Sequence, residues 1–155
     1  MEEQIYNVYW AGPFKWEEQG QYLKPNHVLY ALHGSHHLYG RDVLLYIGRT
    51  NADLAGRLAS HAKWVDDEYD AMTLRIASVG RFTNWKDAYA VEEYPKAAPD
   101  VVRGIETLLI YAHQPAYNTM SKASLDYAKG LRILNAGRIG HLLPEVSYLY
   151  YQDSE

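Results

Sequence analysis

Short apolar runs, separated by turn residues, predict most of the strands of this chain. Residues 43–47 are five apolar or aromatic residues in a row between Asp42 and Gly48, which is the pattern of a short buried strand. Residues 28–32 form a second apolar run, and residues 74–80 alternate apolar and polar positions as a half-buried strand does. The loop between the first two runs favours an antiparallel pair. We therefore expect these three strands to form a small antiparallel sheet.

Other stretches carry apolar residues at helical spacing and are expected to flank this sheet. One follows a turn at Gly48 and runs through residues 54–65. Another begins at Asp100, whose negative charge suits the positive end of a helix, and ends before Pro115. A shorter helix is expected at residues 85–93. The predicted fold class is α/β (α+β), a small central antiparallel sheet of about three strands flanked by helices.

The two ends of the chain lie outside the predicted core, which we place at residues 22–120 of a single domain spanning 1–155. The N-terminal segment, 1–21, is rich in aromatic residues and includes a possible edge strand at 5–10. Its rings either cover the sheet as core or offer faces for stacking of nucleic-acid bases. The C-terminal extension, 121–155, is glycine-rich and basic at its centre. Its expected elements are a helical turn and two strands, at 124–129, 131–134 and 147–151.

Composition narrows the class of protein. A chain of 155 residues with 48% hydrophobic residues suits one compact domain with a real core. It has no cysteine, so disulfides and thiolate metal sites are excluded, and any metal is held by oxygen or imidazole. No segment approaches the ~20 apolar residues of a membrane-spanning helix, and the acidic start of the chain lacks a secretory signature. We therefore expect no membrane association and a cytoplasmic location.

The formal net charge of -4 limits how the protein can bind nucleic acid. Nonspecific binding depends mainly on neutralisation of phosphates by Lys and Arg, which an acidic domain cannot provide through its overall field. The acidic residues are partly gathered in short runs, at 66–70, 92–93 and the two ends of the chain. Binding would have to come from a local basic face.

The candidate chemistry lies on the predicted strand, turn and helix. These elements bring Tyr46, Arg57 and His61 toward a common edge, because residues four apart on a helix lie one above the other. Glu106 lies on the flank of the apolar stripe of the second helix. Burying an ionised carboxylate without a partner is costly. Glu106 therefore either pairs with Arg103 or Arg57, or binds a divalent cation, which is the interpretation we prefer.

This set of residues resembles the GIY-YIG nuclease family. Residues 46–48 read Tyr-Ile-Gly, with Arg57 eleven residues after the tyrosine and His61 beyond it. One strand upstream, residues 28–30 read Val-Leu-Tyr, with Val28 where the family usually has glycine and leucine where it has isoleucine. Downstream, the family has a helix carrying a glutamate and then an asparagine. Residues Glu106 and Asn118 follow in that order, so the resemblance covers roughly residues 26–120.

The resemblance implies a divalent-metal-dependent endonuclease. It would hydrolyse phosphodiester bonds in nucleic acid, with DNA as the first expectation, and leave 5'-phosphate and 3'-hydroxyl ends. Glu106 would hold Mg²⁺ or Mn²⁺, an ion that keeps several of its waters and so accepts a lone protein ligand. Tyr30 would accept a proton from the attacking water, Tyr46 would orient the water or phosphate, and Arg57 would bind phosphate oxygens.

Two of the implied roles have structural alternatives. His61 either relays a proton or hydrogen-bonds a tyrosine. Asn118 lies in a turn after the helix, and a turn-stabilising asparagine is as plausible there as a catalytic one. The catalytic set implied by the resemblance is Tyr30, Tyr46, Arg57, His61, Glu106 and Asn118.

Basic residues near these motifs and in the C-terminal extension are candidates for contacts with a phosphate backbone. The alternative for those in the extension is that they are solvated charges. The candidates are Arg49, Lys63, Lys122, Arg132 and Arg138.

Two other functions compete with a nuclease. One is a non-catalytic nucleic-acid-binding or protein-interaction module on the same fold. The other is a hydrolase centred on the loop of His33, His36 and His37, which lacks a recognisable nucleophile. For that loop a metal site is the less favoured prediction, because no acidic residue lies among the imidazoles; a flexible or substrate-contacting loop is the alternative.

Overall fold

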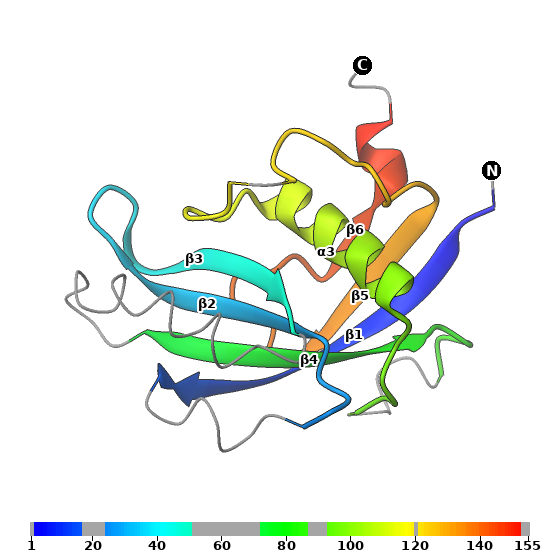
Figure 1. Cartoon of the computed structure of the whole chain (residues 1–155), viewed down its shortest axis with the longest axis horizontal. Helices are drawn as coiled ribbons and strands as arrows, with labels where there is room; N and C mark the ends of the chain where they lie inside the picture. Colours follow the sequence, from blue (N-terminus) through cyan, green and yellow to red (C-terminus); the bar gives the residue numbers. More distant parts are fainter. Residues whose placement is uncertain (1, 17–23, 51–71, 87–92, 120, 153–155) are drawn as a thin grey trace.

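The computed structural model describes residues 2–16, 24–50, 72–86, 93–119 and 121–152. These residues form a curled, mixed sheet of six strands, crossed by one α-helix, α3 (Pro99–His113), and followed by a short 3-10 helix, η2 (Tyr148–Tyr151) (Figure 1). The strands are β1 (Gln4–Lys15), β2 (Leu29–His36), β3 (Gly40–Arg49), β4 (Thr73–Arg81), β5 (Leu131–Gly137) and β6 (Glu145–Ser147).

The predicted fold class is therefore wrong. The expected three-stranded sheet flanked by helices is instead a strand-rich layer, and α3 is the only α-helix in the part of the chain that the structure describes. The runs at 28–32, 43–47 and 74–80 lie in β2, β3 and β4, which are neighbours at one side of the sheet. The helix predicted at 54–65 and residues 87–92 of the one predicted at 85–93 fall outside the described residues.

The difference comes from the two ends of the chain, which both add strands to the sheet. The strand order is β3-β2-β4-β1-β5-β6, so β1 is an interior strand and not an edge strand. It pairs antiparallel with β4 and parallel with β5, more than a hundred residues away in sequence. A buried contact stabilises the β1–β5 pair. Trp10 is fully buried, and its indole N–H donates to Asn135 Oδ1 (3.0 Å).

The aromatic residues of the N-terminal segment belong to the core. Trp10 lies inside the main apolar cluster, and Tyr6 packs against it. Phe14 and Trp16 pack against a second cluster that contains Tyr30. Of the two alternatives for these rings, the structure therefore shows core packing.

The C-terminal residues differ from their predicted elements. The run at 147–151, predicted as a strand, is the last residue of β6 followed by η2, and Ser147 Oγ accepts the N–H of Leu149 (3.1 Å) to begin that turn. The helical turn predicted at 124–129 is a hydrogen-bonded turn without a helix; the Ala128 N–H donates to the Leu125 carbonyl (3.1 Å).

Helix α3 crosses the sheet and contacts β3, β5 and β6 (Figure 1). It begins at Pro99. Proline has no backbone N–H, but no hydrogen bond is lost here, because the amides of the first turn have no partner within the helix. It ends at His113, and Gln114 adopts a left-handed conformation that returns its N–H to the Ile110 carbonyl (2.8 Å). Its buried face includes Val102, Ile105, Leu108 and Leu109, which leaves Glu106 on the flank as the periodicity predicts. Among the described residues, no helix has the length and apolar character needed to span a membrane.

Candidate active site at the edge of the sheet

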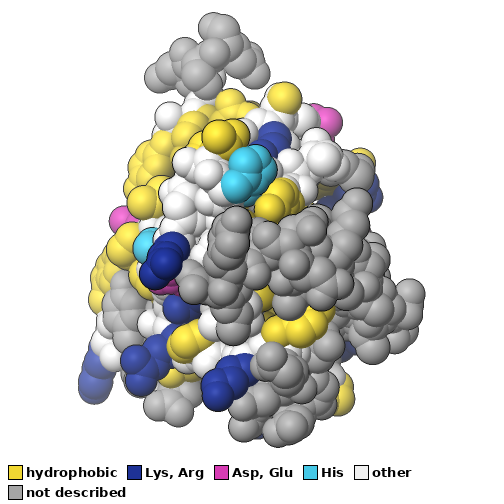
Figure 2. Space-filling view, turned by 90° about the vertical axis from the view of Figure 1, so that its left-hand side faces the viewer, with side chains coloured by type: hydrophobic (Ala, Val, Ile, Leu, Met, Phe, Trp, Pro, Cys, Tyr) yellow, Lys and Arg dark blue, Asp and Glu magenta, His cyan; other side chains and the backbone are white. Residues whose placement is uncertain are grey.

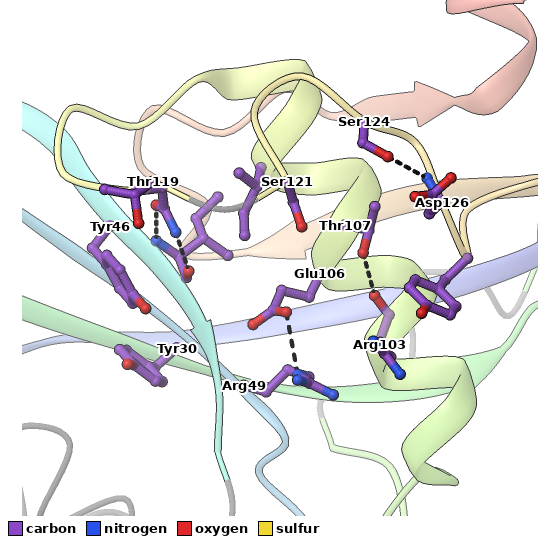
Figure 3. A pocket seen from close by; sticks show the side chains of 14 residues that line it. Tyr30, Tyr46, Arg49, Arg103, Glu106, Thr107, Thr119, Ser121, Ser124 and Asp126 are labelled. Atoms are coloured by element: carbon purple, nitrogen blue, oxygen red, sulfur yellow. Dashed lines mark hydrogen bonds and ion pairs between the residues drawn. The ribbon is translucent and has the colours of Figure 1, made fainter.

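A cleft of about 480 Å³ lies where α3 meets the edge strand β3 (Figure 3). Its walls come from β2, β3, α3 and, after the helix, residues 118–119 and 121–127. Five residues singled out from the sequence line it together: Tyr30, Tyr46, Arg49, Glu106 and Asn118. The other predicted catalytic residues, Arg57 and His61, lie outside the described residues, as does Lys63.

The two tyrosines form one wall of this cleft. Tyr46 lies opposite Leu32 in the β2–β3 pair, so it is a diagonal neighbour of Tyr30 on the same face of the sheet. Their rings stack with centroids 5.9 Å apart and an interplanar angle of 26°. Tyr30 is fully buried, whereas Tyr46 is partly exposed. Tyr46 is therefore the more solvent-exposed of the two tyrosines.

Gly48 makes room for Tyr30. The sequence predicts a turn at Gly48, but the residue lies within β3, directly opposite Tyr30. A Cβ atom at position 48 would lie 2.5 Å from Cζ and 2.6 Å from the hydroxyl of Tyr30. The glycine is therefore required by the close approach of a tyrosine ring and not by a turn.

Glu106 enters the cleft from α3. Its side chain is 14% exposed, and Oε1 lies 3.2 Å from Nε of Arg49, at the end of β3. Arg49 is thus a partner of Glu106 that the sequence did not name, while Arg57, one of the two arginines named, lies outside the described residues. Arg49, a candidate for contact with nucleic acid, is paired here with the candidate metal ligand, because the C-terminal end of β3 runs alongside the helix.

The residues around Glu106 fit a hydrated cation better than a closed metal centre. In the described part of the chain, no three His, Asp or Glu side chains gather into a metal-binding group. Mg²⁺ accepts one carboxylate with waters completing its shell. The mostly buried carboxylate opens onto a cleft that is also lined by the hydroxyl-bearing residues Thr119 and Ser121. A cation there must share Glu106 with Arg49 or displace that guanidinium.

Asn118 stabilises the edge strand that carries Tyr46. The Ile47 N–H donates to Asn118 Oδ1 (2.9 Å), and Asn118 Nδ2 donates to the Ile47 carbonyl (2.9 Å). The side chain therefore replaces a neighbouring strand at one residue of β3. These bonds give Asn118 a structural role at the border of the cleft, but its side chain braces β3 and does not stabilise its own turn as the sequence suggested.

Replacement of Asn118 by alanine is expected to lower the free energy of unfolding by about 2–4 kcal/mol, because it leaves two buried backbone groups of Ile47 without partners. Urea denaturation measures this loss. Asn26→Ala, which removes a partly buried bond to the Tyr94 carbonyl and a bond to the exposed Glu93 carboxylate, is the control and should cost less. Equal losses in the two variants would contradict the role assigned to Asn118.

The remaining basic candidates do not line the cleft. Arg132 donates to Glu3 (2.9 Å) and Glu145 (2.5 Å), and its pKa is raised chiefly by the bond to Glu3. The guanidinium therefore stays charged and is already paired with two carboxylates. Arg138 is exposed beyond the end of β5. Lys122 is half-buried close to the cleft, with its carbonyl accepting from Gln114 (2.7 Å). On the face shown in Figure 2, the described Lys and Arg side chains form separate patches and not one continuous stripe.

The structure places two further residues in the cleft that were not among the predicted site residues. Arg103, named from the sequence only as a possible partner of Glu106, lies three residues before it on α3 and lines the same cleft. Tyr127 also lines the cleft; the sequence predicted a helical turn for its segment but no site residue there.

The histidines of the predicted loop do not form a site together. His33 is fully buried within β2, while His36 and His37 stack at the turn with ring centroids 4.7 Å apart. Burial lowers the pKa of His33 to about 3, helped by the nearby charges of Arg75 and His141 and opposed by Asp42. His33 Nε2 accepts the N–H of His141 (3.3 Å), which requires a neutral ring.

This histidine makes stability depend on pH. Below its ordinary pKa of 6.5 the unfolded chain binds a proton at His33, whereas the folded chain does so only near pH 3. The free energy of unfolding therefore falls by up to about 1.4 kcal/mol per pH unit as pH drops through this range. Between pH 7.5 and pH 5 the protein should lose about 2 kcal/mol more than His33→Gln, measured by urea denaturation. An identical loss in both proteins contradicts the prediction.

Comparisons with known proteins add no assignment: no family model, curated protein or solved structure matches this chain.

Proposed function

We propose that this protein is a divalent-metal-dependent endonuclease that hydrolyses phosphodiester bonds in nucleic acid, DNA first, to 5'-phosphate and 3'-hydroxyl ends. The proposed activity is the one that the resemblance of the sequence to GIY-YIG nucleases implies. One observation carries it: residues chosen for their chemistry, and up to 88 positions apart, line a single cleft. The absence of cysteine suits a reducing compartment, and we place the protein in the cytoplasm.

Negative charge on the phosphate is the first obstacle to hydrolysis. Glu106 would hold Mg²⁺ or Mn²⁺, which when bound supplies Lewis-acid stabilisation of the phosphoryl oxygens. The guanidinium of Arg49 is planar and can bind either a carboxylate or a phosphate through two parallel N–H···O bonds. An incoming phosphate therefore offers Arg49 a second anionic partner beside Glu106. Arg57 and His61 retain the roles implied by the resemblance.

Activation of water is the second requirement. The resemblance gives this role to Tyr30, but its ring is fully buried behind the stacked ring of Tyr46. We therefore assign the phenols one joint role, in which Tyr46 meets the water and Tyr30 holds or accepts its proton. A phenol with its reference pKa of about 10 is a weak base, so this step depends on positive charge close by.

The direct test is incubation of the purified protein with plasmid, single-stranded, branched and RNA substrates. Each is combined with Mg²⁺, Mn²⁺ or a chelator, and the product ends are identified by ligation and by phosphatase treatment. Metal-dependent products with 5'-phosphates are expected. Intact substrates across the whole metal series would overturn the proposal.

The ion pair of Glu106 with Arg49 favours one other function. A carboxylate that already has a cationic partner also suits a non-catalytic module that binds nucleic acid through Arg49 and its neighbours. Such a module would retain binding in chelator, and Glu106→Gln would leave that binding unchanged or tighten it.

A further inference from the structure

We propose that Tyr127 and Arg103 form a stacking platform for an unpaired nucleobase, so that the preferred substrate has single-stranded nucleotides at the cleft. This inference rests on the proposed function and names its substrate class. Both side chains line the same cleft as Glu106. The platform consists of these two residues only.

The geometry of the pair leaves an aromatic face open. Cζ of Arg103 lies 3.7 Å from the centroid of the Tyr127 ring, so the guanidinium covers one side of it. Tyr127 nevertheless remains 61% exposed, among the most exposed large side chains of the described residues. An aromatic ring held by an arginine is a combination that binds single-stranded nucleic acid, because every base has a face that can stack.

The backbone holds this ring at a conformational cost. Tyr127 has φ of 73°, a left-handed conformation that is unfavourable for a bulky residue. Its carbonyl oxygen lies 2.5 Å from where a Cβ of residue 104 would be, so only Gly104 allows the segment to approach α3 this closely. Burial of the ring does not offset the cost of this conformation, because the side chain is exposed. Unfavourable backbone conformations of this kind gather at functional sites.

The platform lies beside the proposed metal ligand. Arg103 precedes Glu106 by three residues on α3, a spacing that places two side chains on one side of a helix, and both line one cleft with Tyr127. A base on Tyr127 therefore belongs to a nucleotide close to a phosphate held at Glu106.

The same arrangement disfavours an intact duplex. Bases in a duplex are stacked on their neighbours, so their faces reach a protein ring only after unstacking. The acidic net charge of -4 also leaves the protein without a general attraction for duplex phosphates. Arg49 and Arg103, which line the cleft together with Glu106, can supply local contacts to a strand that is held by its base.

The test measures binding without requiring catalysis. A fluorescent 12-nucleotide strand of DNA, the same strand in RNA, and the matching blunt DNA duplex are titrated by anisotropy in chelator. A second series uses a single strand containing 2-aminopurine, whose fluorescence is quenched when it stacks. Wild-type protein is compared with Tyr127→Ala, Tyr127→Phe and Tyr150→Ala. Tyr150 is the matched control because it is a 55% exposed tyrosine beside an arginine, Arg132, but outside the cleft.

Wild-type protein should bind the single strands more tightly than the duplex and quench 2-aminopurine. Tyr127→Ala should weaken single-strand binding about 5- to 150-fold and abolish quenching, while Tyr127→Phe and Tyr150→Ala bind like wild type. Equal binding of strand and duplex by wild type, or unchanged quenching in a folded Tyr127→Ala, overturns the inference. If the protein binds as expected but cuts nothing, the platform stands and the nuclease proposal fails.

Discussion

Glu106→Gln is expected to lower metal-dependent cleavage by about 10³-fold or more while leaving the protein folded. The amide keeps the size of the side chain but removes the negative charge that would hold the cation, and with it several kcal/mol of transition-state stabilisation. Initial rates on a fluorescent substrate at saturating Mg²⁺ measure the loss. Thermal unfolding confirms the fold, because the Arg49 partner is partly exposed and can return to solvent.

The control for this variant is Glu93→Gln. Glu93 also pairs with a basic side chain, Lys24 (3.3 Å), but it lies outside the cleft, so cleavage should be unchanged. Raising the Mg²⁺ or Mn²⁺ concentration should not rescue Glu106→Gln fully. Undiminished cutting by this variant removes Glu106 from the mechanism, and equal losses in both variants indicate a general effect of charge.

Removal of either tyrosine hydroxyl should slow cleavage by about 10²- to 10⁴-fold, the range of general acid–base catalysis. Tyr30→Phe and Tyr46→Phe keep both rings, so the stack at 5.9 Å and the packing against Gly48 are retained. If the phenols handle one proton together, the double variant should be no slower than the slower single variant. Groups that act as a unit give such non-additive losses.

Single-turnover rates and binding of uncleaved substrate separate chemistry from affinity. Binding should change little in any of the three variants, and Tyr6→Phe, in the core away from the cleft, is the control. Losses that multiply in the double variant refute a joint role. A defect confined to binding would place the tyrosines on the substrate path instead of at the reacting water.

Local patterns predicted the elements better than their assembly. The helix α3 and the strands β2, β3 and β4 follow from the spacing of apolar residues and from Asp100 and Pro115 at the ends of the helix, because these signals act over a few residues. The pairing of β1 with β5 depends on contacts such as Trp10 with Asn135, which are 125 positions apart. No local pattern distinguishes an interior strand of this kind from the edge strand that the sequence suggests.

The candidate site shows the same division. Glu106 was identified because a carboxylate on the flank of an apolar stripe needs a partner, and the structure supplies Arg49, which the sequence did not name as that partner. Gly48 was expected to turn the chain, yet its register opposite Tyr30 gives it a packing role. Asn118 holds the backbone of Ile47, a contact set by how the segment after α3 returns along β3.

The sequence by itself determined that residues 28–32, 43–47 and 74–80 are extended and, within a residue or so, where the long helix begins and ends, since these depend on neighbouring residues. Tertiary structure alone decided that the chain's two ends complete a six-stranded layer, that Arg49 meets Glu106, and that Tyr127 stands open beside them. Those outcomes are set by packing between segments far apart in the chain, where many arrangements satisfy the same local preferences and burial of the whole core selects one.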